Sequence, residues 1–176
     1  ILNGQVDDNG GARDSYSVGF GLSWNSIDPD EAHGTFTLPE ASIFEVDVVL
    51  ADKSPSPSTG WDGETLTKRG DGTLILSGAN TYSGATNIEA GTLVAGAVDT
   101  LASTEGVTVN SGAQLSLNAH QVITNISGGG TIDLGTAGLT ISNNAANAFS
   151  GLIEGAAGSL TKTGAGNLTW SGDNTY

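Results

Sequence analysis

The chain has 176 residues, enough for one domain of ordinary size or for a slice of a longer array. Its 27 glycines and its modest 37% of hydrophobic residues predict a thin core of short strands joined by glycine turns. A net charge of −14 argues against nucleic-acid partners and anionic lipid surfaces, and the lack of cysteine excludes a disulfide framework.

The first third of the chain predicts irregular β-structure. We expect a strand over residues 16–24, because apolar side chains there alternate with Ser and Gly. Further strands are expected over 35–38 and 43–51, whereas 27–34 and 52–63 are polar, proline-containing loops. In the strand over 43–51 we expect one buried face, formed by Phe44, Val46, Val48 and Leu50.

From residue 64 onward the pattern becomes regular. Short strands recur, each introduced by a glycine: Gly72, Gly91, Gly112, Gly130 and Gly166. The steps are 19, 21, 18 and 36 residues, and we interpret the last as two steps of 18. Apolar pairs two residues apart follow these glycines, the last being Leu168 and Trp170. A period near 20 residues is typical of a solenoid whose coils stack on one another.

One stretch occurs twice. Residues 66–82 read LTKRGDGTLILSGANTY, residues 160–176 read LTKTGAGNLTWSGDNTY, and 11 of the 17 positions are identical. With coils about 4.8 Å apart, we expect the offset of 94 residues to span four or five coils. Because the sequence ends inside the second copy, we expect a segment excised from a longer array.

The class of solenoid follows by exclusion. A leucine-rich repeat has a longer consensus and an asparagine ladder, and helical repeats need 30 or more residues with helical periodicity. Neither pattern is present, so the sequence predicts an all-β parallel β-helix. We expect residues 1–176 to form one unit, with less regular, loop-bearing coils over 1–63 and regular repeat coils over 64–176.

Residues 66–96 resemble the autotransporter-associated β-strand repeat of Gram-negative autotransporter passengers. The resemblance rests on the following residues: Leu66, Thr67, Lys68, Gly70, Gly72, Leu74, Leu76, Ser77, Gly78, Asn80, Tyr82, Gly84, Gly91, Thr92 and Leu93. The second copy departs mildly from the pattern at Asn167 and Trp170. Residues 22–68 also look like the stretch that precedes such repeats in large adhesin-type autotransporters.

The resemblance implies a right-handed parallel β-helix in a passenger of the type V secretion pathway, at the cell surface or secreted. It also implies an outer-membrane barrel in the same polypeptide, outside this sequence. The implied partners are a host-surface glycan or protein, or a second passenger through self-association. The repeat itself is expected to be a scaffold that helps the passenger to fold.

A structural role is therefore expected for the residues shared by the two copies. In the first copy these are Leu66, Thr67, Lys68, Gly70, Gly72, Leu74, Gly78, Asn80 and Tyr82. In the second they are Leu160, Lys162, Gly164, Gly166, Leu168, Gly172, Asn174 and Tyr176. The equivalence of Lys68 and Lys162 favours a place at a corner of the coil over a catalytic role.

No catalytic residue is predicted. His33 and His120 are the two histidines, but no serine lies in a GxSxG or GDSG context, and we expect His120 to be solvated. The acidic residues of DPDEAH, 28–33, could suggest a calcium site. The spacing of an EF-hand loop is missing there, and the calcium-binding β-roll repeat is missing around Asp133. We therefore favour an exposed turn and expect no metal. A carbohydrate-active β-helix enzyme needs clustered acidic residues for general acid/base catalysis, whereas Asp71 and Asp99 are isolated in sequence.

Among the aromatic residues, Trp61 is the one candidate for ligand contact, because it lies in a Pro- and Ser-rich loop. Trp24 and Trp170 have inward parity, and Tyr82 and Tyr176 are repeat-equivalent, so all four are expected in the core. The sequence thus favours a non-enzymatic passenger scaffold, without a cofactor, that contributes to adhesion or cell aggregation. Two alternatives stay open: a carbohydrate-active β-helix enzyme, and a pure spacer stalk.

Overall fold

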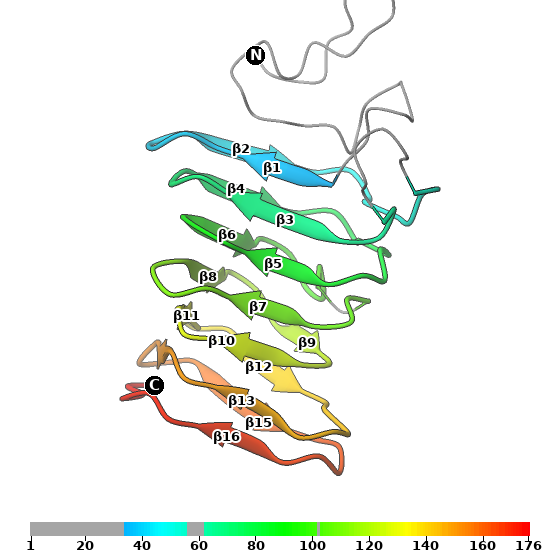
Figure 1. Cartoon of the computed structure of the whole chain (residues 1–176). Coiled ribbons are helices and arrows are strands. Elements are labelled where there is room, and N and C mark those ends of the chain that lie inside the picture. Colours follow the sequence, from blue (N-terminus) through cyan, green and yellow to red (C-terminus); the bar gives the residue numbers. More distant parts are fainter. Residues whose placement is uncertain (1–33, 56–61, 102) are drawn as a thin grey trace, which may run out of the picture.

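The computed structural model describes residues 34–55, 62–101 and 103–176. They form an all-strand parallel β-solenoid in which successive coils stack along one axis (Figure 1). The expected strand over 16–24, the acidic segment 28–33 and Trp61 lie outside the described residues. Within the described ranges, no helix has the length and apolarity needed to cross a membrane.

Three sheets make the sides of the solenoid. A seven-stranded sheet has the order β1 (Thr35–Thr37), β3 (Leu66–Arg69), β5 (Thr86–Ile88), β7 (Val107–Val109), β10 (Ile126–Gly128), β13 (Asn147–Phe149) and β16 (Leu168–Trp170). A six-stranded sheet has the order β14 (Leu152–Glu154), β11 (Thr131–Asp133), β8 (Gln114–Leu117), β6 (Thr92–Ala95), β4 (Thr73–Leu76) and β2 (Ile43–Val46). A three-stranded sheet has the order β15 (Ser159–Lys162), β12 (Gly138–Ile141) and β9 (Gln121–Ile123). The parallel pairing confirms the predicted fold class.

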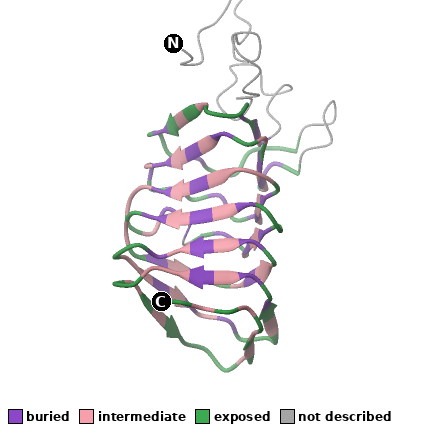
Figure 2. Ribbon diagram, turned by 90° about the vertical axis from the view of Figure 1, so that its left-hand side faces the viewer, coloured by how far each residue is buried: buried purple, intermediate pink, exposed green. Residues whose placement is uncertain are grey.

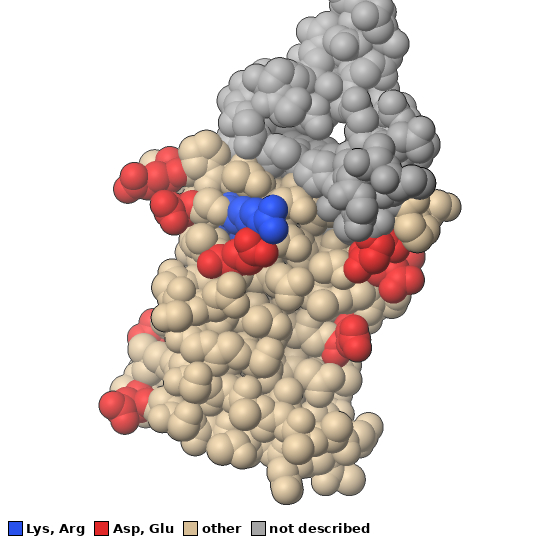
Figure 3. All heavy atoms as spheres, viewed as in Figure 1, with Lys and Arg blue, Asp and Glu red and all other residues tan. Residues whose placement is uncertain are grey.

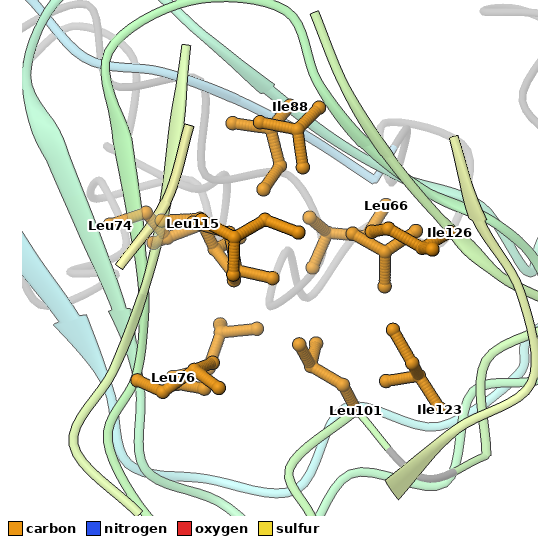
Figure 4. Packing of buried hydrophobic residues seen from close by; sticks show 14 of the residues in the cluster. Leu66, Leu74, Leu76, Ile88, Leu101, Leu115, Ile123 and Ile126 are labelled. Atoms are coloured by element: carbon orange, nitrogen blue, oxygen red, sulfur yellow. The ribbon is translucent and has the colours of Figure 1, made fainter. Parts of the chain in front are cut away.

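The core is a set of apolar stacks that run along the axis. Side chains alternate between the two faces of each strand, so every second residue points inward (Figure 2). One stack joins residues that are each fully buried and paired in register between neighbouring coils: Leu74, Leu93, Leu115, Ile132 and Ile153. In Figure 4, Leu66 and Ile126 face Leu115 across the core, and Leu101 lies between Leu76 and Ile123. Each coil therefore owes its core to the coils on either side.

The predicted strand over 43–51 is wrong in its second half. It ends at Val46, and Val48 is 47% exposed although its parity predicts burial. The chain turns after Val46, and Leu50 returns to the core as the next side of the coil begins. Alternation of side chains cannot show where a coil turns its corner, because the inward residues on both sides of the corner are apolar.

The offset of 94 residues spans between four and five coils, as expected, but it is not a whole number of turns. The first copy begins in the seven-stranded sheet with β3, whereas the second begins in the three-stranded sheet with β15. Leu168 and Trp170 consequently stack on Asn147 and Phe149, and not on the Leu74 stack.

The interpretation of 36 residues as two steps of 18 fails for the same reason. Gly151 precedes β14, as Gly130 precedes β11 one coil earlier. Gly166 lies at a different corner, beside Ala145. The second copy is thus the same sequence placed on another side of the solenoid.

Candidate functional site

The lysine of the first copy is buried at a corner between two coils. Lys68 is fully buried, and its inward neighbours in register are Phe36 and Ile88. Its Nζ donates to the carbonyl oxygens of Arg69 at 3.0 Å, Gly70 at 2.7 Å and Ala90 at 3.0 Å. Burial lowers the pKa of Lys68 to about 8, and the charge of Asp71 partly opposes that shift. Because an ammonium has three donors and all three are used, this lysine ties two corners together.

The second copy repeats this arrangement. Lys162 donates to the carbonyl oxygens of Thr163 and Gly164, the latter at 2.9 Å, and more weakly to Asn143 at 3.4 Å. The first two acceptors are the residues one and two positions after the lysine, as they are for Lys68. Lys162 is exposed, however, because β15 and β16 are the end strands of their sheets among the described residues.

The conserved asparagine of the two copies binds the preceding coil in the same way. Asn80 accepts a hydrogen bond from the amide of Leu50 at 2.9 Å, and Asn174 accepts one from the amide of Ile153 at 2.9 Å. Asn80 also donates to the carbonyl of Thr100 at 3.2 Å. The asparagine therefore replaces a ladder bond at the corner where the strand has ended.

Both copies also need glycine after the lysine. Gly70 has φ of 71° and Gly164 has φ of 78°, the left-handed region that side chains disfavour. A Cβ at Gly70 would lie 2.2 Å from the carbonyl oxygen of Leu38. The other repeat glycines approach the backbone of the preceding coil equally closely: Gly72, Gly78, Gly166 and Gly172.

The remaining repeat residues differ between the copies in burial. Leu66, Leu74 and Tyr82 are buried, whereas their counterparts Leu160 and Leu168 are half-buried and Tyr176 is 49% exposed. The hydroxyl of Tyr82 lies 2.7 Å from Thr86 Oγ1, and burial raises the pKa of Tyr82. Thr67 is on the outward face of its strand and is half-buried. Trp170 packs edge-on against Phe149, with ring centroids 6.3 Å apart.

The isolated acidic residues and His120 do not come together. Asp99 accepts from the amide of Val122 at 3.0 Å, and Asp133 from the amide of Gly135 at 2.9 Å. Asp71 and His120 are exposed, and His120 lies within 3.5 Å of Thr140 Oγ1. In the described part of the chain, no three potential metal-ligating side chains gather.

Charged side chains stand at the margins of the seven-stranded face. Arg69 and Glu89 form a bidentate ion pair, with Nε to Oε2 at 2.7 Å and Nη2 to Oε1 at 3.2 Å. The hydrogen bond from Arg69 lowers the pKa of Glu89. Most of the described surface in the view of Figure 3 carries neither acidic nor basic residues.

A shallow groove of about 350 Å³ runs along the corner that leads into the seven-stranded sheet. It spans several coils, because residues that precede successive strands line it: Ala85, Glu105, Asn125, Ala145 and Ala146. Thr108 and Ser127, on the outward faces of the adjoining strands, complete it together with Asn147. Glu105 is the one carboxylate among the lining residues, which include no basic and no aromatic side chain.

The groove coincides with a break in the hydrogen-bonded ladder. In the neighbouring coils the first amide of the strand donates to the corner carbonyl of the next coil: Leu66 to Ala85, Thr86 to Gly106, Val107 to Asn125 and Asn147 to Asn167. Ile126 instead donates to Asn147 Oδ1 at 2.9 Å. Between β10 and β13 only Gly128 and Phe149 remain in register.

Asn147 causes this break, and sequence reasoning missed it. Its position belongs to an inward stack that holds Ile126 before it and Leu168 after it. The side-chain amide of Asn147 accepts the hydrogen bond of the Ile126 amide. The corner residues Ala145 and Ala146 therefore take no part in the backbone ladder with Ile126. A polar residue at an apolar position of the repeat is the sequence signal that could have revealed the break. It was missed because no strand was predicted over Asn147–Phe149.

Two comparisons with known proteins agree with this architecture. The family model of the passenger-associated-transport-repeat matches residues 66–95 and 160–176. The chain is also 47% identical over 91 residues, 51% of its length, to the adhesin BmaC autotransporter of Brucella suis. The aligned region is 3% of that relative.

The family match falls on the two copies whose lysine and asparagine hold the corners. The match to BmaC independently extends over half of the chain. Together, these findings show that the chain contains two matches to the passenger-associated-transport-repeat within a parallel β-solenoid, and that half of it is similar to part of an autotransporter adhesin.

Proposed function

We propose that this chain is a non-enzymatic scaffold in a surface-displayed or secreted passenger of a Gram-negative bacterium. It contributes to adhesion or cell aggregation, and its repeats support folding of the passenger during secretion. The observation that carries the proposal is the use of the repeat residues: Lys68, Asn80 and Gly70 all join one coil to the next. The adhesive part of the proposal is supported by the similarity to BmaC, whose name describes an adhesin.

The carbohydrate-active alternative lacks support in the described ranges. Glycoside hydrolysis needs two carboxylates flanking one bond, and the groove holds Glu105 alone. The partners proposed are a host-surface glycan or protein, or a second passenger. The proposed membrane partner is an outer-membrane barrel of the same polypeptide.

Deletion of one complete coil tests this proposal. Removing residues 86–106 joins Ala85 to Val107, and because Leu66, Thr86 and Val107 share one register, the remaining coils can restack. Bacteria displaying the passenger with and without this coil are compared for surface level, aggregation and host-cell binding. We expect unchanged display with reduced aggregation or binding.

Two other outcomes contradict parts of the proposal. Loss of display alone would assign the repeats to folding and export without an adhesive role. Unchanged display and unchanged adhesion would make this region a spacer. A control deletion of residues 86–95, less than one turn, breaks the register and should abolish display.

A further inference from the structure

The groove beside Asn147 presents polar atoms that the protein does not use. Asn125 donates through Nδ2 to the carbonyl of Glu105 at 3.0 Å, and Asn147 accepts through Oδ1 from Ile126. Within the described part of the chain, no hydrogen bond reaches Asn125 Oδ1, Asn147 Nδ2 or the Glu105 carboxylate. The groove therefore offers both acceptors and a donor to a ligand.

The chemistry of the lining selects the kind of ligand. No basic side chain lines the groove, so nothing there would compensate an anionic group in a chain with net charge −14. The methyl groups of Ala85, Ala145 and Ala146 supply small apolar contacts between the polar atoms. A ligand with hydroxyl groups and exposed C–H faces matches that alternation.

The spacing of the coils sets the direction of the ligand. Corner residues of successive coils lie about 4.8 Å apart along the axis, which is close to the length of one pyranose unit. An extended oligosaccharide parallel to the axis would place successive sugars against successive corners. A β-strand in the same direction would present its backbone groups at a different repeat.

We propose that this groove binds a neutral, hydroxyl-rich oligosaccharide along the solenoid axis. The inference deepens the proposed adhesive function and rests on it for its biological meaning. Glu105, Asn125 and Asn147 hold sugar hydroxyls, and the interrupted ladder at Ile126 provides the space. The lack of aromatic stacking predicts weak single-site binding, with Kd in the millimolar range.

The test is an NMR titration of the purified 176-residue chain. The probes are cellotetraose and triacetylchitotriose, with sialyllactose as an anionic comparator and spermidine as a cationic one. We expect at least one neutral probe to shift the amide signals of the groove residues, and sialyllactose to bind more weakly. No shift with either neutral probe at millimolar concentration overturns the proposal.

Matched variants separate the groove from the rest of the surface. Ala146→Tyr fills the groove at an exposed corner, whereas Ala156→Tyr adds the same side chain at an exposed turn elsewhere. We expect about tenfold weaker neutral-sugar binding for A146Y and none of this loss for A156Y. Equal binding by both variants overturns the proposal, as does tighter binding of sialyllactose.

Two further variants test the chemistry. Asn147→Leu restores an apolar residue to the stack and should close the groove, abolishing the shifts while the chain stays folded. Glu105→Gln should reduce neutral-sugar binding by less than about threefold and should remove any spermidine binding. Binding of spermidine alone would show a simple electrostatic site and would overturn the proposal.

Cell adhesion is measured separately with displayed A146Y. If the purified chain binds sugar but cells displaying A146Y adhere normally, the groove is a sugar-binding site that does not contribute to adhesion. If neither neutral probe binds yet deletion of residues 86–106 reduces adhesion, the groove proposal fails and the proposed function stands.

Discussion

The two repeat copies carry nearly the same side chains in different surroundings. Lys68 and Lys162 bind the same two following carbonyls, and Asn80 and Asn174 bind the same kind of amide in the preceding coil. Yet Lys68 is fully buried between coils, whereas Lys162 is exposed at the end of the stack. The repeat thus specifies its own hydrogen bonds locally, while its burial comes from the coils on either side.

The largest difference is expected for the buried leucines. Leu74→Ala removes a fully buried side chain with coils above and below, and should lower the free energy of unfolding by about 3 kcal/mol. Leu168→Ala, at the equivalent position of the second copy, should cost about 1 kcal/mol because that leucine is half-buried. Urea denaturation followed by circular dichroism measures both; equal losses would show that burial by neighbours does not matter.

The lysines should differ next. Lys68→Met keeps the apolar stem but leaves three corner carbonyls without their donor, which should cost about 2 kcal/mol. Lys162→Met should cost less than about 0.5 kcal/mol, because water can replace an exposed donor. Denaturation midpoints of the two variants decide between a buried tie and a surface contact, and a larger loss for K162M would contradict the comparison.

The asparagines should show a smaller gap. Asn80→Ala takes the acceptor from the amide of Leu50 in a buried corner, with an expected loss of about 1.5 kcal/mol. Asn174→Ala should cost about 0.5 kcal/mol, since the end of the stack admits water. Hydrogen exchange of the Leu50 and Ile153 amides gives a direct readout, in which only the first should change strongly.

The stability of the chain should also depend on pH through Lys68. Burial lowers the pKa of folded Lys68 to about 8 from 10.5, so the unfolded chain binds more protons between these values. The free energy of unfolding should therefore rise as the pH increases above 8. Measurements stay below pH 10, where the raised pKa of Tyr82 begins to act in the opposite direction. K68M should lack this rise, and a rise of the same size in K68M would assign it to other groups.

Much of the fold could be predicted from the sequence, because a solenoid repeats its pattern. Glycines and apolar pairs recur near 20 residues, so the strands β4, β6, β8 and β11 followed from periodicity alone. The corner role of Lys68 followed from its equivalence to Lys162, and the hydrogen bonds of both are consistent with it. These features depend on local sequence, which is why one chain suffices to find them.

The phase of the second copy could not be predicted in this way. The number of residues in a corner varies: the corner between β10 and β11 is shorter than the corner between β3 and β4. The number of residues between two copies therefore does not show which side of the solenoid the second copy occupies. The groove was missed for a related reason. Asn147 replaces an apolar residue at a core position, and only the structure shows that its side chain turns to the amide of Ile126.

The rotation of the second copy has a consequence for how such passengers are assembled. Leu66 and Asn147 lie in the same sheet, a whole number of turns apart, whereas the second copy starts at Leu160 in another sheet. The repeat builds the same corners wherever it begins. The number of residues between two copies therefore sets the side of the solenoid on which the second copy lies. Insertion or loss of a few corner residues between copies can therefore turn the outward face of one copy around the solenoid axis without changing the residues of either copy.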